Sequence, residues 1–479
     1  MNTKVLFRVD GSPQIGLGHL VRCIALAHML RNYFHITFFC KEIPEQIKKE
    51  LSKNQFSLEN LKEEKFFLSQ IKPQEIVVCD GYSFNTNYQK QIKSRGAKLV
   101  CIDDLHDGQS YADLIINHAP GIKPVDYKAQ YFTQYALGPE YALLRPVFLE
   151  QARKNRKIVK VEVVLICFGG SDYKNLTELT LRVIMDFTNF KRILVVTGTA
   201  YNNPDGLNNL VIRDNRIEHY HAVDEKKMLS LMIESDLAIV PASGILLEVI
   251  AAGCIPISGM YIENQKYLYS NYNKSSYFID AKDFNAVDLR KAIEKSFKIN
   301  FGKQKVVDGN SGKRLLNLFL QLELKEKIKL RKANNSDIKI TFQWASNPKI
   351  RAFSFNKHII TKEEHALWFP SKLTENDCFY LIAEMDNLPV GSIRFDLIGI
   401  EVNISYLIDP EYQGKGLGQI ILNKGIEFIL DKAKENKIDF KKIVGFVMKT
   451  NIPSLKAFER LGFVKYEEDD KFKFEMSKS

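Results

Sequence analysis

Short apolar runs alternate with helical stretches along the first two thirds of the chain. The runs are apolar on both faces, which is typical of strands buried in a parallel sheet with crossover helices. The charged stretch 151–160 interrupts the pattern, which then begins again, so the sequence predicts two doubly wound α/β units in tandem. Ligands bind such units where the carboxyl ends of the strands face a crevice. The predicted strands cover residues 5–9, 36–40, 76–79, 99–102 and 114–117, and then 161–168, 193–197, 237–240 and 255–258.

A different pattern follows the charged stretch 322–332, which we interpret as a domain boundary. A helix over residues 338–351 precedes three strands, and a Gly-rich turn, a helix, a strand and a final helix complete the pattern. This order is typical of an α+β domain. We therefore predict a GT-B-like pair of Rossmann-type domains over residues 1–155 and 156–324, followed by an α+β domain over residues 327–479.

The composition is that of a globular protein, with 45% hydrophobic and 26% charged residues. No apolar run approaches the ~20 residues that span a bilayer, and the first residues lack the apolar core of a signal peptide. The seven cysteines are scattered and odd in number, which favours buried thiols over disulfides or a zinc site. We expect a cytoplasmic protein that binds neither a membrane nor a metal ion.

The net charge of +11 is compatible with three roles: binding of a nucleic acid, binding of a small anionic substrate, or solubility alone.

The first motif with chemical content reads GLGH and follows the first predicted strand. Gly16 and Gly18 would let the backbone approach a ligand, and the helix that follows favours an anion at its N-terminus. The third glycine of the dinucleotide fingerprint is missing. Because a helix N-terminus disfavours imidazolium, we expect His19 to be neutral near pH 7 and able to accept a proton. The alternative is a histidine that only packs against the turn.

Two further motifs follow predicted strands of the second unit. Gly170 and Ser171 stand at a helix start, where they could hold a phosphate, although an ordinary strand-to-helix turn would look the same. Ser243 and Gly244 begin a helix in which Glu248 lies among apolar residues. An unpaired carboxylate is costly to bury. Glu248 could accept both hydroxyls of a ribose, unless another group in the protein is its partner.

Residues 1 to about 320 resemble the GT-B-type UDP-sugar hydrolases of the pseudaminic acid pathway. The resemblance runs through FRVDGSPQIGLGHLVR (7–22), CDGY (79–82), CFGGSD (167–172) and ASGILLEVIAAG (242–253), with shorter matches between and after them. It implies that His19 activates water against the anomeric carbon and that UDP leaves by C–O cleavage with inversion. Tyr82 would lie close to the sugar, or else be an aromatic residue at a strand end. The implied UDP or sugar contacts are Asp10, Gly16, Gly18, Arg22, Asn117, Tyr141, Gly170, Ser171, Ser243, Gly244, Glu248, Asn264 and Gln265.

The third part carries Q-x-x-G-x-G at residues 413–418, directly after a predicted strand. Backbone N–H groups converge on a pyrophosphate in such a loop. With a second helix start at residues 451–454, the pattern resembles the GNAT N-acetyltransferases over residues 328 to 476. That resemblance implies acetyl-CoA as a co-substrate. The implied acetyl-CoA contacts are Leu407, Ile408, Gln413, Gly414, Lys415, Gly416, Leu417, Gly418, Asn451 and Ser454.

The sequence departs from the GNAT pattern at two positions. Phe458 stands where many members have a tyrosine that acts as a general acid, and a phenyl ring has no proton to give. Asn403 stands where a carboxylate is common on the central strand. Glu401 points to the same face of that strand by period-two alternation, so we expect it to replace the missing carboxylate.

Together these features predict a bifunctional enzyme of nonulosonic acid synthesis. The GNAT domain would acetylate the 4-amino group of UDP-4-amino-4,6-dideoxy-N-acetyl-β-L-altrosamine, and the domain pair would hydrolyse the diacetamido product to free sugar and UDP. The expected partners are a UDP-amino sugar and acetyl-CoA. Their diphosphates are compatible with the basic charge, so no nucleic acid is needed to explain it. Two alternatives stay open: a GT-B glycosyltransferase that uses a UDP-amino sugar, and a nucleic-acid- or ribosome-associated protein with a protein-acetylating GNAT domain.

Overall fold

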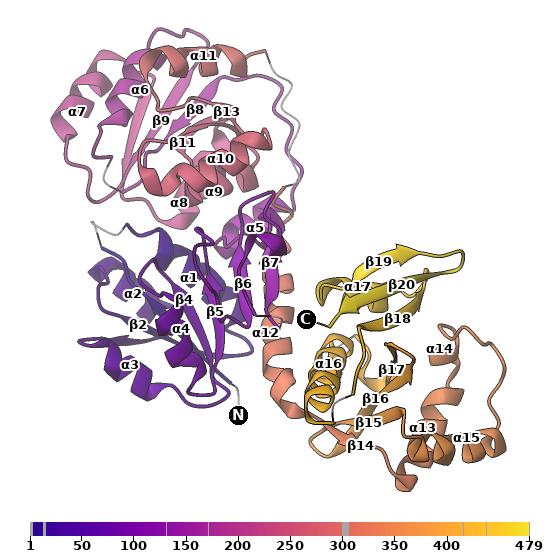
Figure 1. Cartoon of the computed structure of the whole chain (residues 1–479). Helices are drawn as coiled ribbons and strands as arrows, with labels where there is room; N and C mark the ends of the chain where they lie inside the picture. Colours follow the sequence, from indigo (N-terminus) through magenta and orange to yellow (C-terminus); the bar gives the residue numbers. More distant parts are fainter. Residues whose placement is uncertain are drawn as a thin grey trace. The chain divides into compact units, whose positions relative to one another are not determined.

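The computed structural model describes residues 3–12, 16–130, 132–170, 172–298, 306–414, 416–436 and 438–478. The chain forms two compact units, Met1–Leu316 and Asn317–Ser479. Figure 1 shows two sheets in the first unit and one sheet in the second.

The first sheet of unit 1 is parallel throughout, with the strand order β3-β2-β1-β4-β5-β6-β7. All five predicted strands are present. The prediction missed two edge strands, β3 and β7, because neither has a continuous apolar run. The strands are β1 (Lys4–Val9), β2 (His35–Cys40), β3 (Ser57–Asn60), β4 (Ile76–Asp80), β5 (Lys98–Ile102), β6 (Leu114–Asn117) and β7 (Gln134–Leu137), and the helices are α1 (Gly18–Leu30), α2 (Glu45–Lys53), α3 (Glu64–Gln70), α4 (Thr86–Lys93) and α5 (Pro146–Ala152).

The second sheet is also parallel, with the order β10-β9-β8-β11-β12-β13. One hydrophobic core lies on each of its faces: α8 and α9 contribute to the first, and α6, α7 and α11 to the second. The strands are β8 (Val163–Ile166), β9 (Arg192–Thr197), β10 (Ile217–His221), β11 (Leu237–Pro241), β12 (Ile255–Gly259) and β13 (Ile279–Asp280), and the helices are α6 (Leu176–Ile184), α7 (Pro204–Arg213), α8 (Glu225–Glu234), α9 (Gly244–Ala252), α10 (Lys266–Lys274) and α11 (Ala286–Ser296).

The strand order reverses once in each parallel sheet. In the first sheet the reversal lies between β1 and β4, and in the second between β8 and β11. The loops after two such strands run in opposite directions and leave a crevice at the carboxyl ends, where α/β proteins bind ligands. The GLGH and CDGY segments follow β1 and β4, and the two glycine-containing segments of the second unit follow β8 and β11. All four therefore stand at the switch points.

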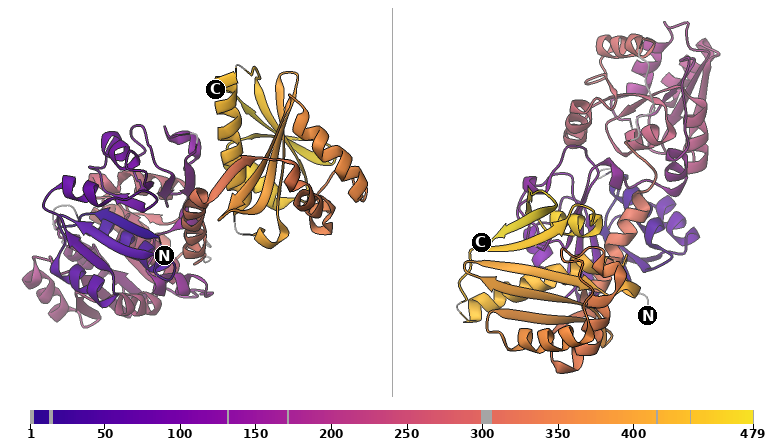
Figure 2. Two further views of the ribbon diagram at one scale, coloured as in Figure 1. Left: turned by 90° about the horizontal axis from the view of Figure 1, so that it is seen from below. Right: turned by 90° about the vertical axis from the view of Figure 1, so that its right-hand side faces the viewer.

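Unit 2 is built on a mixed sheet with the order β14-β15-β16-β17-β18-β20-β19. Among its described strands, only β17 and β18 are parallel neighbours. Figure 2 shows α16 on one face of this sheet and α13 and α15 on the other. The strands are β14 (Ile328–Lys332), β15 (Cys378–Met385), β16 (Leu388–Ile398), β17 (Glu401–Ile408), β18 (Lys442–Met448), β19 (Val464–Glu467) and β20 (Lys471–Ser477), and the helices are α13 (Ile338–Ser346), α14 (Pro348–Arg351), α15 (Lys362–Thr374), α16 (Leu417–Asn436) and α17 (Ile452–Arg460).

The charged stretch 322–332 has regular structure. Its first residues end helix α12 (Ser311–Lys327), and the others form β14, which pairs with β15. The boundary between the two units falls within α12, at Leu316 and Asn317. The fold class is confirmed: two doubly wound α/β domains precede an α+β domain. Within the described residues, no helix has the length and apolar character needed to cross a membrane.

Candidate functional site

His19 is held by a buried carboxylate at the first switch point. It is the second residue of α1, and its Nδ1 lies 2.6 Å from Oδ1 of Asp80, the last residue of β4. Asp80 is only 1% exposed. A carboxylate accepts hydrogen bonds, so in the neutral imidazole Nδ1 carries the proton and Nε2 keeps its lone pair. His19 can therefore accept a proton at Nε2.

Arg22 keeps Asp80 ionised. It lies one turn after His19 on α1 and donates to both oxygens of Asp80, at 2.5 and 2.6 Å, and to Asp104 at 2.7 Å. Burial raises the pKa of the Asp80 carboxyl, but the charges of Arg22 and His19 outweigh burial and hold that pKa well below its usual range. Arg22 is thus committed to two carboxylates, and its predicted contact with UDP or sugar stays a prediction.

Tyr82 lies beside His19, and its predicted closeness to the sugar stays a prediction. The two rings meet edge to face with their centroids 5.1 Å apart, and the Tyr82 side chain is 53% exposed. Burial of part of the side chain and the charge of Asp104 raise the pKa of the phenol. The hydroxyl therefore stays protonated at neutral pH and can donate a hydrogen bond to a ligand.

Three of the predicted sugar-side residues use their side chains within the protein. Asp10 accepts the backbone N–H groups of residues 41 and 42. Asn117 donates to the Tyr127 hydroxyl at 3.0 Å and accepts a backbone N–H two residues later. Gln265 accepts the backbone N–H four residues before it, at 3.0 Å. These contacts shape the loops around the site, and direct ligand contacts by the three residues stay predictions.

The predicted phosphate contacts lie on tight turns and helix starts. Gly16 has φ +89° and Gly18 is the first residue of α1. Gly170 packs so closely against Gly198 that a Cβ added to Gly198 would lie 2.5 Å from the Cα of Gly170.

Ser243 occupies the N-cap position of α9 without a capping hydrogen bond, which leaves its hydroxyl available. Gly244 follows it as an exposed residue. Tyr141 ends a 3₁₀ turn, whereas Ser171 and the side chain of Asn264 lie outside the described residues.

Glu248 has a partner in the protein. Arg145 donates to its Oε1 at 2.7 and 3.2 Å, from a position 103 residues earlier in the chain. The carboxylate is only 7% exposed. Burial raises its pKa, and the charge of Arg145 acts in the opposite direction. Both hydrogen bonds reach the same oxygen, and no donor among the described residues reaches Oε2. A ribose contact through Oε2 stays a prediction.

In unit 2 the central sheet opens at the predicted acetyl-CoA site. Strand β17 pairs with β16 along its whole length. Its pairing with β18 runs only from Glu401 to Ile404, although both strands continue. Leu407 and Ile408 lie on the stretch of β17 beyond this pairing. Within the described chain this stretch has no strand on its β18 side, so its backbone groups on that edge can pair with a ligand.

The glycine loop follows β17 and leads into α16. Gly414 and Gly416 have φ values of +78° and +79°, a conformation that favours glycine. Gln413 donates to the backbone carbonyl of residue 408, while Leu417 and Gly418 form the first turn of α16. Lys415 lies outside the described residues. In α17, the Asn451 side chain accepts the backbone N–H of Ser454 and caps the helix.

Tyr406 is a possible proton donor that the sequence did not single out. Its hydroxyl donates to Oγ of Ser454 at 2.8 Å, and burial raises its pKa to about 12. Phe458 is 2% exposed and stacks on Phe474 in the core. The rings of Tyr406 and Phe458 lie 6.1 Å apart, so a phenol stands close to the position that lacks one. The alternation of side chains along β17 is a signal that could have placed Tyr406 on the core face of the sheet. Its hydrogen bond to Ser454 of α17 could not be predicted from sequence spacing.

Glu401 lies in an ion-pair network at the start of β17. Lys442 on the neighbouring strand reaches its Oε1 at 2.9 Å. Asn403 lies two residues closer to the opening in the sheet, and its Oδ1 is buried with no hydrogen-bond partner among the described residues. Both side chains point to the same face of the strand. A catalytic role for Glu401 stays a prediction.

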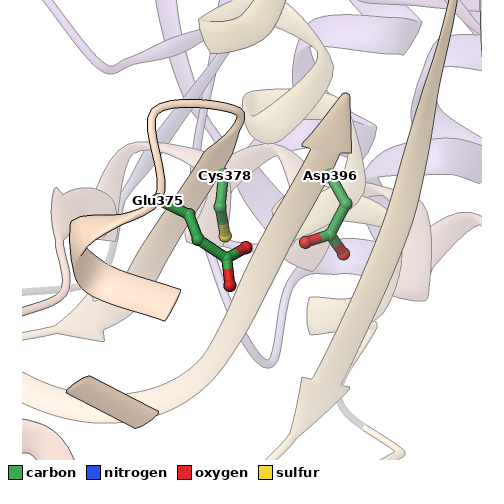
Figure 3. Close-up of side chains that lie close together, drawn as sticks. All are labelled: Glu375, Cys378 and Asp396. Atoms are coloured by element: carbon green, nitrogen blue, oxygen red, sulfur yellow. The ribbon is translucent and has the colours of Figure 1, made fainter. Parts of the chain in front are cut away.

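One group of described residues has the spacing of metal ligands: Glu375, Cys378 and Asp396, with ligand atoms within 4.8 Å of one another (Figure 3). Lys372 pairs with both carboxylates, at 2.6 and 3.6 Å, and Arg394 pairs with Asp396 at 2.8 Å. The carboxylates already have cationic partners, so we assign no metal ion to this group. The expectation that the protein binds no metal stays a prediction.

The comparisons with known proteins agree with both parts of this description. A family model described as an acetyltransferase (GNAT) domain matches residues 327–464. Over 291 residues the chain is 30% identical to the UDP-2,4-diacetamido-2,4,6-trideoxy-beta-L-altropyranose hydrolase of Campylobacter jejuni, and the match covers 58% of this chain and 99% of that protein. The acetyltransferase PseH of the same organism is 27% identical over 139 residues, which are 29% of this chain and 84% of PseH. An uncharacterized protein of Methanocaldococcus jannaschii, MJ1062, is 29% identical over 496 residues and matches 96% of this chain and 97% of its own length.

Proposed function

The chain belongs to the family of the UDP-2,4-diacetamido-2,4,6-trideoxy-β-L-altropyranose hydrolase, with a GNAT acetyltransferase domain after it, and from that premise we propose that it performs two consecutive steps of pseudaminic acid synthesis. The GNAT domain transfers acetyl from acetyl-CoA to the 4-amino group of UDP-4-amino-4,6-dideoxy-N-acetyl-β-L-altrosamine. The hydrolase part then cleaves the product into UDP and free 2,4-diacetamido-2,4,6-trideoxy-L-altrose.

The hydrolase step in this proposal uses water as the nucleophile. Nε2 of His19 takes a proton from water while the water oxygen bonds to the anomeric carbon. The bond between that carbon and the diphosphate oxygen breaks on the opposite face, which inverts the anomeric centre and releases UDP. Because UDP is a good leaving group, the site mainly positions water and sugar and holds the diphosphate. Tyr82 lies beside the base and orients the sugar through its hydroxyl.

The acetyltransferase step is direct attack by the 4-amino group on the thioester carbonyl. A bond forms between the amine nitrogen and the acetyl carbon while the carbon–sulfur bond breaks. The nitrogen gives up one proton to solvent, and the thiolate of CoA takes up one proton. Phe458 cannot supply that proton. The nearby Tyr406 has a hydroxyl that can, and this hydroxyl lies 2.8 Å from Oγ of Ser454. We assign the proton donation to Tyr406. The diphosphate of acetyl-CoA binds the backbone N–H groups of the glycine loop at the start of α16.

The observation that carries the hydrolase proposal is the pair of His19 and Asp80 at the switch point, with Tyr82 beside it. A histidine whose Nδ1 is held by a buried carboxylate presents a basic Nε2, which is what activation of water requires. The relative of the first two domains is named for hydrolysis of a UDP-diacetamido sugar, and the relative of the third domain is an acetyltransferase. Addition of an acetyl group followed by hydrolysis fits this pair.

The test is to incubate the purified chain with the diacetamido UDP-sugar in ¹⁸O-labelled water without an acceptor. We expect UDP release, with the label in the free sugar because the C–O bond is cleaved. A glycosyltransferase would release UDP only after an acceptor is added. Label in UDP instead would contradict the proposed direction of attack. Retention of the chain on nucleic acid at physiological salt would instead support the ribosome-associated alternative.

A further inference from the structure

Helix α5 brings an arginine to α9, the helix that carries Glu248. Phe148 and Leu149 of α5 are buried in the same hydrophobic core as Leu246 of α9. Arg145 stands at the N-cap position of α5. Its guanidinium carbon lies 5.1 Å from the centroid of the Phe148 ring, a cation–π contact that favours this position of the side chain. The packing of the two helices therefore fixes where Arg145 meets α9.

Arg145 holds one oxygen of the Glu248 carboxylate and leaves the other without a donor. Its Nε and Nη2 both donate to Oε1, at 3.2 and 2.7 Å, so Oε1 accepts two charge-assisted hydrogen bonds. Oε2 accepts none from the described residues. Because both donors belong to one planar guanidinium, they fix the direction of the carboxylate and leave Oε2 as its free acceptor.

Arg145 also favours the charged form of this carboxylate. The Glu248 side chain is 10% exposed, and burial raises its pKa. The charge of Arg145 lowers that pKa, whereas the charge of Glu225 raises it. Arg145 is thus the cation that opposes protonation of Glu248. An ionised carboxylate accepts stronger hydrogen bonds than a neutral acid, so the same contact that orients Oε2 also strengthens it as an acceptor.

We propose that Arg145 is a positioning residue of the UDP site, which orients Glu248 so that Oε2 accepts a hydrogen bond from one hydroxyl of the ribose. A ribose hydroxyl is a donor and Oε2 is an acceptor without a donor, so the two groups are complementary. Arg145 acts through Glu248 and touches no part of the nucleotide. This inference rests on the proposed function of unit 1 and on the ribose contact of Glu248.

The test uses variants of the full-length chain and three nucleotides: UDP, 2′-deoxy-UDP and 3′-deoxy-UDP, the last two of which lack one ribose hydroxyl each. Arg145→Met keeps an unbranched side chain over Phe148 but removes the charge and both donors. Arg145→Lys keeps the charge but has a single nitrogen in place of the planar fork. Arg290→Met is the control for the same change in net charge, because Arg290 pairs with Asp186 at the surface of unit 1.

Calorimetric titration gives the affinity of each variant for the three nucleotides. We expect the wild type to bind UDP about tenfold more tightly than the analogue that lacks the hydroxyl facing Glu248, the effect of one hydrogen bond to a charged group. Arg145→Met should reduce this preference to about twofold or less, and Arg145→Lys to about threefold, while the affinity for that analogue stays nearly unchanged. Arg290→Met should keep the wild-type preference. In a Glu248→Gln background, Arg145→Met should not change the preference further, because Arg145 acts through Glu248.

The possible results distinguish this inference from the proposed function. A wild-type preference in Arg145→Met would overturn the inference alone. An equal loss of affinity for all three nucleotides would overturn it as well, because Arg145 would then support the fold or touch the diphosphate. If Arg145→Met does not fold, Arg145→Lys decides by the same two criteria. If the wild-type chain bound UDP without any preference, the ribose contact and this inference would fail together, and if it bound no UDP, the hydrolase function would fail with them.

Discussion

Nδ1 of His19 lies 2.6 Å from Oδ1 of Asp80, and Arg22 donates to both oxygens of the same carboxylate. This arrangement fixes the proton on Nδ1 and turns the basic Nε2 away from the carboxylate. It also lies at the switch point between β1 and β4, where the strand order of the first sheet reverses. The position of the base therefore follows from the topology, and the tautomer of its neutral ring follows from the contact with one buried carboxylate.

The first prediction concerns Asp80. Asp80→Asn removes the charge that stabilises protonated His19 and puts an amide where Arg22 and His19 both need an acceptor. We expect the rate of UDP release at saturating substrate to fall about 100-fold or more, because proton transfer to a positioned base contributes at least that much. The KM should change little. The measurement is UDP release at neutral pH over a range of substrate concentrations.

Acetyl transfer by the Asp80→Asn variant is its internal control, because the substitution lies in unit 1. UDP release at the wild-type rate would exclude Asp80 from the positioning of His19, and an equal loss of UDP release and acetyl transfer would show that Asp80 only supports the fold.

The second prediction concerns Glu248. Glu248→Gln keeps the size of the side chain but removes the charge and one of the two acceptor oxygens. We expect about a tenfold loss of UDP affinity, since a hydrogen bond to a charged group stabilises by about 1.5–3 kcal/mol. Glu225→Gln is the matched control, because Glu225 also faces Arg145, at 3.8 Å, but is 33% exposed. Equal UDP affinities in calorimetry for wild type and Glu248→Gln would exclude the ribose contact.

The third prediction concerns Tyr406. Tyr406→Phe keeps the ring and removes the hydroxyl that donates to Ser454. We expect acetyl transfer to slow about tenfold or more while CoA affinity changes little, because a proton donor acts on the leaving thiolate and not on binding. Hydrolysis of the diacetamido UDP-sugar should be unaffected. Unchanged acetyl transfer would remove Tyr406 from the mechanism and leave the thiolate to take its proton from water.

The fourth prediction concerns the stability of unit 1 at acid pH. Burial lowers the pKa of His118 to about 4, and the charge of Arg22 adds to this effect. Between pH 6.5 and pH 4 the unfolded chain binds a proton that native His118 excludes, so this contribution to stability is complete above pH 6.5 and is lost as the pH falls towards 4. At 1.36 kcal/mol per pH unit, the free energy of unfolding should drop by about 2 kcal/mol between pH 6.5 and pH 5.

His118→Gln should flatten this part of the pH dependence. Denaturant unfolding followed by circular dichroism at several pH values measures the slope. Both tryptophans, Trp344 and Trp368, lie in unit 2, so fluorescence follows that unit separately. The same slope in wild type and variant would mean that native His118 takes up its proton at an ordinary pH.

The hydrophobic pattern was sufficient to predict the strands that are buried on both faces. β1, β4 and β11 consist largely of β-branched and other apolar residues, and each was predicted within one residue at either end. The strands that the pattern missed lie at or near sheet edges and carry polar residues, as in β10 (IEHYH) and β19 (VKYE). Their pairing depends on neighbouring strands rather than on their own composition.

The ion pairs of the candidate site could not be predicted in this way. His19 and Asp80 are 61 residues apart, and Arg145 and Glu248 are 103 residues apart. Sequence spacing carries no information about such contacts until the strand order is known. The motifs identified His19 and Glu248 as unusual residues for their positions, but only the fold shows which groups are their partners.

The most direct test of the account is one reaction followed in two ways, with the wild-type chain and with His19→Ala. The chain is given the 4-amino UDP-sugar and acetyl-CoA, and both CoA thiol and UDP are measured over time. We predict that the wild type releases both and that His19→Ala releases CoA at the wild-type rate while UDP release stops and the acetylated UDP-sugar accumulates. UDP release by His19→Ala at the wild-type rate would contradict the central claim that His19 is the base of the hydrolase site.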